Sequence, residues 1–216
     1  MNDLKRETYF PCELFITEKP EWVSQLNKIC DPYIEESKKR NKPILEDRDK
    51  KFRAKLNDKG MMFHSLPLQH DKNFHPFMQY VATKSSEILN DQGYDLQHYN
   101  MAVNELWVQQ FGKSGAGYHS AHVHPNNHIS GFYYLKCTDR TSMPIFHDPR
   151  PGKVLTDLPE KNPEKVTPAS SRFFYQPKPG TLIFFNSYMI HEYGLDFGLD
   201  PFRFIHFNIQ AVKKNA

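Results

Sequence analysis

The chain has 216 residues, of which 38% are hydrophobic and 14% aromatic, and its formal net charge is only +3. This composition excludes a chain that is disordered throughout and predicts one domain, over residues 1–216, with a substantial core. No stretch has the roughly 18 consecutive apolar residues of a membrane span, and the N-terminus lacks the apolar segment of a signal peptide. We therefore expect a cytoplasmic protein that has no membrane partner.

Cysteine and basic residues give weaker signals. Cys12, Cys30 and Cys137 are odd in number and far apart, which favours reduced thiols over disulfides. Residues 36–59 hold ten Lys or Arg among many acids, a pattern typical of a solvated helix face or loop. A contact surface for an acidic partner is the alternative. No aromatic residues alternate with the basic ones there, so the sequence does not favour nucleic acid as a partner.

The first part of the chain has helical periodicity. In residues 20–36 the apolar side chains recur every three or four positions, which predicts an amphipathic helix. The dipeptide Asp31-Pro32 predicts a kink or a break in it. A second helical pattern covers residues 74–89. We expect residues 1–97 to provide helical support and an N-terminal strand.

From Tyr99 the period changes to two, and we expect a strand of which one face is shared by Tyr99, Met101, Val103, Glu105, Trp107, Gln109 and Phe111. Further short strands are predicted at 118–124, 130–137, 143–147, 172–176, 180–186 and 202–212. Short strands separated by Pro, Gly and Asn predict a mainly β fold of the jelly-roll type, with the helices on its outside and its core in residues 98–212. The Pro- and charge-rich residues 148–170 read as a long loop.

Histidines cluster in HSAHVHPNNH, residues 119–128. If 118–124 is extended, His122 and His124 lie on the same face and aim two imidazoles at one point. A third ligand must then come from elsewhere, and His191, which follows the apolar run GTLIFFN, is the candidate. His119, His128 and His147 have no assigned role.

Arg203 shares its strand face with Ile205, Phe207 and Ile209 in PFRFIHFNIQA. An arginine on an apolar face needs a partner, and its guanidinium matches a carboxylate bidentately. The sequence leaves two interpretations open: Arg203 binds an anionic ligand, or it pairs with an internal acid such as Glu105.

The segments HVHPNNHISGFYYL, GTLIFFNSYMIH and PFRF together resemble the Fe(II)- and 2-oxoglutarate-dependent oxygenases, in particular their prolyl-hydroxylase-like branch, which has members in phages and bacteria. The resemblance spans about residues 99–212. It implies a double-stranded β-helix, the cupin-like form of the jelly roll. It also implies Fe(II) as cofactor and 2-oxoglutarate as cosubstrate. Carried across, the metal ligands are His122, His124 and His191, while Arg203 and Tyr134 bind the far carboxylate of 2-oxoglutarate.

One departure from the family's pattern concerns the second ligand, because His124 stands where the common triad has a carboxylate. Three imidazoles would keep the open metal positions that the chemistry needs and leave the site more positive. Alternatively, His124 lies outside the ligand set and an acid such as Asp148 completes it.

The resemblance implies oxidative decarboxylation of 2-oxoglutarate coupled to hydroxylation of a small-molecule or peptidyl substrate by O₂, in the host cytoplasm if a phage encodes the protein. Two other functions remain open: a cupin-type dioxygenase that needs no 2-oxoglutarate, and a non-catalytic jelly-roll binding module. From strand position we expect the mouth of the pocket to be lined by Asn104, Trp107, Gln109 and Asn186.

Overall fold

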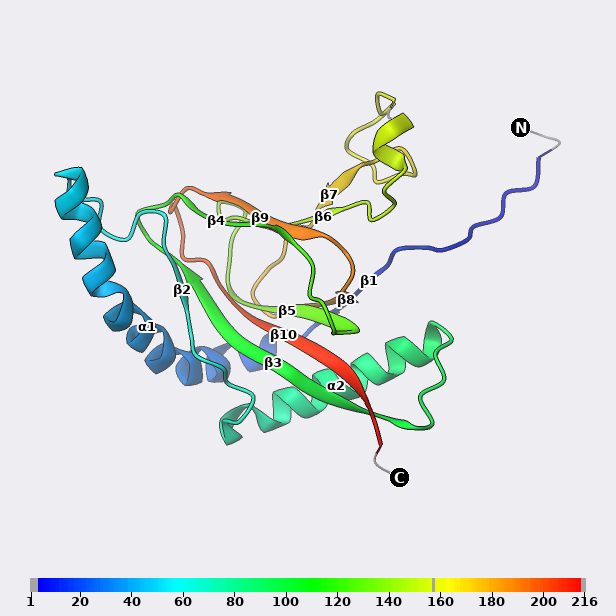
Figure 1. Ribbon diagram of the computed structural model, residues 1–216, viewed down its shortest axis with the longest axis horizontal. Helices are drawn as coiled ribbons and strands as arrows, with labels where there is room; N and C mark the ends of the chain where they lie inside the picture. Colours follow the sequence, from blue (N-terminus) through cyan, green and yellow to red (C-terminus); the bar gives the residue numbers. More distant parts are fainter. Residues whose placement is uncertain (1–3, 157, 215–216) are drawn as a thin grey trace.

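The computed structural model describes residues 4–156 and 158–214 (Figure 1). The helices are η1 (Pro20–Trp22), α1 (Val23–Phe52), η2 (Lys72–Phe74), α2 (His75–Asp91) and η3 (Lys153–Thr156). The strands are β1 (Leu14–Glu18), β2 (Met62–His64), β3 (Tyr99–Phe111), β4 (Gly117–His122), β5 (Ile129–Lys136), β6 (Pro144–His147), β7 (Arg172–Phe174), β8 (Thr181–Asn186), β9 (His191–Asp196) and β10 (Arg203–Lys213).

The strands form two antiparallel sheets. The larger has the order β1-β8-β5-β10-β3-β2, and the smaller has the order β4-β9-β6-β7. Strands β3 to β10 thus form a double-stranded β-helix, and the predicted jelly roll is confirmed. Figure 1 shows α1 and α2 on one side of the larger sheet and the smaller sheet on the other.

The larger sheet is buried on both faces. Its outer face packs against α1 and α2 in the helix-side cluster, to which it contributes Leu106, Val108, Ile129, Tyr133, Leu135, Leu182, Phe184, Ile205, Phe207 and Ile209. Its inner face and the smaller sheet share the inner cluster, formed by Phe111, Phe132, Tyr134, Cys137, Phe146, Ile183, Phe185, Met189, Tyr193, Phe202 and Phe204. Successive residues of one strand therefore belong to different cores.

Helix α1 is longer than predicted and passes through both Pro32 and Pro43, so the expected break at Asp31-Pro32 is wrong. An interior proline costs a helix about 3 kcal/mol. The buried stripe Leu26, Cys30 and Ile34 offsets this cost, since each such side chain contributes about 1.5–3 kcal/mol on burial. Residues 36–52 of the basic segment continue this helix with mostly exposed side chains, and residues 53–59 lie beyond its end.

Strand β3 has the predicted bounds, but its side chains do not keep one face. The pairing with β10 shifts where Asn208 faces Glu105 and Ile209 faces Val103, so Asn104 is the extra residue of a β-bulge. Beyond the bulge Val103 packs against the helix-side cluster, whereas Trp107 and Phe111 lie on the inner side. The prediction of a common face holds only from Glu105 onward.

Strands β1 and β2 lie within residues 1–97, where one N-terminal strand was expected without bounds, whereas β9 was not predicted. The first two extend the larger sheet at its edges, and β9 begins at His191. All three cysteines are free thiols, as expected. Over residues 4–156 and 158–214, no helix has the length and apolar character needed to cross a membrane.

Candidate metal centre

Three histidines meet between the two sheets. His122 is the last residue of β4, His191 is the first residue of β9, and these two residues pair across the smaller sheet. His124 follows β4, where its backbone N–H donates to the carbonyl of Ser187 at 3.0 Å. One ring nitrogen from each of His122, His124 and His191 lies within 4.8 Å of the others. The predicted convergence is therefore present, although His124 lies beyond the strand rather than on it.

The ring nitrogens face the directions that a metal site requires. Nδ1 of His122 lies 2.7 Å from the carbonyl of Ser120, and Nδ1 of His191 lies 3.0 Å from that of Met189. Each carbonyl accepts a hydrogen bond from Nδ1–H, which leaves Nε2 unprotonated and available as a ligand. The Nε2 atoms of His124 and His191 are 3.2 Å apart, so they point to the same place.

Burial, with a smaller contribution from the neighbouring imidazoles, lowers the pKa of His124 and that of His191 to about 3, so both rings are neutral at pH 7. The aromatic rings of Phe132, Phe146 and Phe185 surround His191 at centroid distances of 4.8–6.2 Å. Neutral imidazole is the form that binds a divalent metal, so the donor set fits Fe(II).

A buried polar network holds His124. The side-chain amide of Asn208 lies 3.2 Å from Nδ1 of His124, and it also donates to Glu105. Its oxygen accepts from Ser130 at 2.5 Å and lies 3.1 Å from Nε2 of His206. Rotation of this amide can place either its oxygen or its nitrogen against Nδ1. His124, which is predicted to stand in place of an acid, is thus held by Asn208 of strand β10.

Asp148, the alternative third ligand, lies elsewhere. Its carboxylate accepts from the guanidinium of Arg150, with Nη2 2.6 Å from Oδ2, and this pair lies in the long loop after β6. Asp148 does not belong to the metal-competent group found among the described residues. The geometry therefore favours His124 over Asp148.

Arg203 is buried, but it faces the helices rather than the histidines. Its guanidinium donates to Asp31 of α1 at 2.6 Å, to Asn27 at 3.1 Å and to Gln110 at 2.8 Å. Arg203 does share a face with Ile205, as the sequence predicts, yet that face is the outer one. The assignment of Arg203 to the cosubstrate stays a prediction, and in this structure its guanidinium is bound to α1 instead. The acid that pairs with Arg203 is Asp31, and not Glu105.

Tyr134 lies on the inner face, as a cosubstrate ligand would. It is fully buried, and its hydroxyl lies 2.8 Å from that of Tyr193. The rings of Phe202 and Phe204 lie 6.2 and 6.0 Å from the ring of Tyr134. This part of the interior is therefore filled by aromatic side chains.

Of the residues expected at the pocket mouth, Trp107 and Gln109 belong to the inner face. Asn186 instead exchanges two hydrogen bonds of 2.9 Å with Gln92, and Asn104 is exposed. The sequence reading missed His206, which is buried between Trp107 and His124 at ring distances of 4.3 and 4.5 Å. His206 and Asn208 alternate with the apolar residues Ile205, Phe207 and Ile209, and this alternation in the sequence could have identified His206 as a residue of the opposite face.

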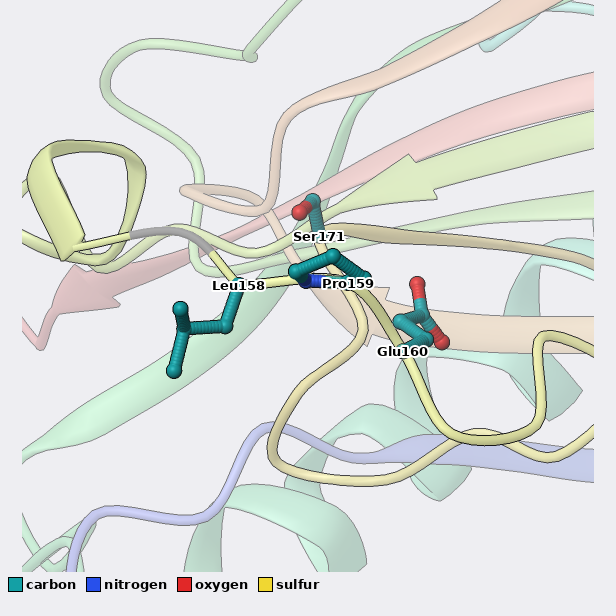
Figure 2. Close-up of a pocket in the computed structure, with 4 residues that line it drawn as sticks. All are labelled: Leu158, Pro159, Glu160 and Ser171. Atoms are coloured by element: carbon teal, nitrogen blue, oxygen red, sulfur yellow. The ribbon is translucent and has the colours of Figure 1, made fainter.

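One surface pocket, of about 350 Å³, lies in the long loop and away from the histidines. Figure 2 shows its lining by Leu158, Pro159, Glu160 and Ser171. It contains no imidazole and only one carboxylate. The metal centre is therefore not part of this pocket.

Comparison with known proteins gives one family match. Residues 105–196 match the family described as "Putative 2OG-Fe(II) oxygenase", a segment that contains all three converging histidines. No curated protein is similar enough in sequence to match.

Two solved structures share the fold across most of both chains. A viral collagen prolyl hydroxylase from Paramecium Bursaria Chlorella virus-1, in complex with 2-oxoglutarate, is 13% identical with a TM-score of 0.52, over 92% of this chain and 96% of that one. A prolyl-4-hydroxylase from Pseudomonas putida is 10% identical with a TM-score of 0.50, over 95% and 94%.

The fold is a double-stranded β-helix, and its three converging histidines offer a donor set that could hold a metal ion. Residues 105–196, less than half of the chain, are similar to a family whose description implies Fe(II) and 2-oxoglutarate as cofactors.

Proposed function

We propose that His122, His124 and His191 bind Fe(II) in this oxygenase, and that the enzyme hydroxylates a C–H bond of a small-molecule or peptidyl substrate. The observation that supports the ligand set is the convergence of three ring nitrogens within 4.8 Å, inside the segment that matches the family. Both solved structures above are of prolyl hydroxylases, so a prolyl residue in a peptide is the first substrate to test.

The bound Fe(II) and 2-oxoglutarate supply the oxidative chemistry, in which O₂ converts 2-oxoglutarate to succinate and CO₂ while the substrate is hydroxylated. The protein orients the three imidazoles through the carbonyls of Ser120 and Met189 and through Asn208. The rings of Phe132 and Phe185 exclude water from one side of His191.

Anaerobic addition of Fe(II) and 2-oxoglutarate tests this function. We expect a visible charge-transfer band, followed by succinate formation when air is admitted. Absence of both in the wild-type protein would refute the proposal.

Replacement of a ligand tests the proposed set. In His191→Ala we expect the affinity for Fe(II) or Mn(II) to fall more than about 100-fold, since even residues that only orient ligands contribute 10–100-fold. His70→Ala is the control, because His70 is exposed and lies in the loop before η2. The measurement is calorimetric titration of the metal under anaerobic conditions. Equal affinities in the two variants would exclude His191 as a ligand.

A cupin-type dioxygenase that works without 2-oxoglutarate is the second candidate. The specific observation in its favour is that the buried Arg203 is turned away from the three-histidine centre. It predicts O₂ consumption with Fe(II) and substrate alone, without succinate.

A further inference from the structure

The second half of α1 belongs to neither core. The buried side chains of this helix are Leu26, Cys30, Ile34 and Ser37, and residues 38–52 contain none. Figure 1 shows this half extending beyond the two sheets at the left of the view. A helix in a folded protein is stabilised mainly by the packing of its apolar face. Core packing therefore does not explain the sequence of this half.

Hydrogen bonds fix the segment that follows the helix. Arg48 donates to the carbonyls of Asn57 and Lys59 at 2.6 and 2.7 Å. The carboxylate of Asp49 accepts from the backbone N–H of Leu56 at 3.2 Å. Both residues connect the last turns of α1 to the segment after it, so residues 38–59 form one ordered surface, which we call the basic surface.

The basic surface concentrates the positive charge of the chain. It carries ten Lys or Arg and four Asp or Glu, for a net charge of +6, whereas the whole chain has +3. Four of its cations form ion pairs with acids of the same helix: Lys38, Lys42, Arg48 and Lys51. Five of its cations have no ion pair within residues 4–156 and 158–214: Lys39, Lys50, Arg53, Lys55 and Lys59. Carboxylates of a partner can therefore bind these five without breaking an existing pair.

Two hollows lie on the basic surface. The first, of about 390 Å³, has four lysines in its lining: Lys38, Lys39, Lys42 and Lys113. The two acids in the same lining are already bound. Glu35 pairs with Lys38 at 2.6 Å, and Asp58 accepts from the backbone N–H of Lys113 at 2.9 Å. The first hollow thus offers cations to an anionic side chain.

The second hollow, of about 430 Å³, lies at the end of α1. Lys50, Arg53 and Lys55 line it, together with Glu46 and Asp49. Asp49 is bound by Arg48 at 2.9 Å, so its charge is already balanced. The second hollow is therefore also suited to an anionic side chain.

Exposed apolar side chains on the basic surface favour a polypeptide as its partner. Ile44 is 62% exposed and Phe52 is 69% exposed. A polypeptide can cover such side chains with its own apolar groups, whereas the phosphates of a nucleic acid cannot. Asp47 also lies among the cations. A duplex carries charge at every phosphate and would be repelled there, while a polypeptide can place its acids only opposite cations.

We propose that the basic surface binds an acidic segment of a protein partner. The carboxylates of this segment bind Lys39, Lys50 and Lys55, and its apolar side chains cover Ile44 and Phe52. The binding does not involve the three histidines, so it is independent of the metal.

The test measures the binding of a fluorescein-labelled peptide of alternating Glu-Glu-Leu and Glu-Glu-Phe units by fluorescence anisotropy. In the triple variant Lys39→Glu, Lys50→Glu and Lys55→Glu we expect at least about a ten-fold loss of affinity. A control variant makes the same change of net charge at exposed positions elsewhere: Lys72→Glu, Lys161→Glu and Lys213→Glu. Its affinity is expected to stay within about three-fold of the wild-type value, because salt screens distant charges.

A double variant, Ile44→Ser with Phe52→Ser, tests the apolar contacts. We expect about a ten-fold loss of affinity for the same peptide, because its Leu and Phe side chains lose their contacts. For a peptide of Glu and Ser, the double variant and the wild-type protein should have equal affinities.

Three results would overturn the inference. The first is tighter binding of a duplex DNA oligonucleotide than of the peptide, which would make the partner a nucleic acid. The second is an equal loss of affinity in the two triple variants, which would reduce the effect to net charge. The third is the absence of peptide binding by the wild-type protein at low ionic strength.

Discussion

The two faces of strand β10 show how one strand serves two unlike environments. Its outer residues Ile205, Phe207 and Ile209 are fully buried in an apolar cluster under the helices, where Arg203 is tied to Asp31. Its inner residues His206 and Asn208 belong instead to the polar network around the three histidines. The outer face stabilises the fold and the inner face positions the chemistry, and the alternation of side chains keeps them apart.

The largest effect is expected on the outer face. Phe207 is fully buried and contacts Phe77 and Phe184 at ring distances of 5.9 and 5.3 Å. Phe207→Ala should lower the free energy of unfolding by about 3–5 kcal/mol, because it removes the ring and leaves a cavity. The measurement is denaturant unfolding of the metal-free protein, with the exposed Phe197→Ala as control.

Metal affinity of the folded Phe207→Ala protein should stay within a few-fold of the wild-type value. If the fully folded Phe207→Ala protein showed a large loss of metal affinity, the outer and inner faces of β10 would not be independent.

The second largest effect per residue is expected on acidification, because the histidines whose pKa values are lowered lie on the inner side of the sheet and not on the outer face of β10. Burial lowers the pKa of His119 to about 4, and the pKa values of His124 and His191 to about 3, from the ordinary value of 6.5. Below pH 6.5 the unfolded chain binds protons that the folded chain does not, so stability is complete above that pH and falls as the pH decreases.

For the metal-free protein we expect each of these three histidines to contribute a loss of about 2 kcal/mol between pH 7 and pH 5. Unfolding free energies measured across this range check the sign and the size. A curve that stays level down to pH 5 would contradict the neutral, buried state of these imidazoles.

The smallest effect concerns the ion pair that attaches the outer face to α1. The side chain of Asp31 is 57% exposed, so solvent screens its interaction with the buried Arg203. Asp31→Asn should therefore lower the free energy of unfolding by only about 1 kcal/mol. Asp47→Asn on the same helix is the matched control, since its pair with Lys51 is exposed on both sides. Equal effects of the two substitutions on the free energy of unfolding would mean that the burial of Arg203 does not strengthen its ion pair with Asp31.

The sequence predicted helix α2, strand β3 and the jelly roll because their hydrophobic periods are long and regular. It did not predict the continuity of α1 through Pro32, because the packing of Leu26, Cys30 and Ile34 against the sheet outweighs the local cost of proline. Short edge strands such as β2 have too few residues for a period to be recognised.

By itself the sequence identified His122, His124 and His191 as candidate ligands that converge, although His124 lies after the end of β4 and is not placed by strand geometry. It also determined that Arg203 shares a face with Ile205. Only the tertiary structure decided which face that is. Both faces of β10 are buried, so the hydrophobic period cannot distinguish the inner face from the outer one. Neighbouring residues of a strand point to opposite faces, and Arg203 therefore contacts Asp31 of α1 rather than the interior between the sheets.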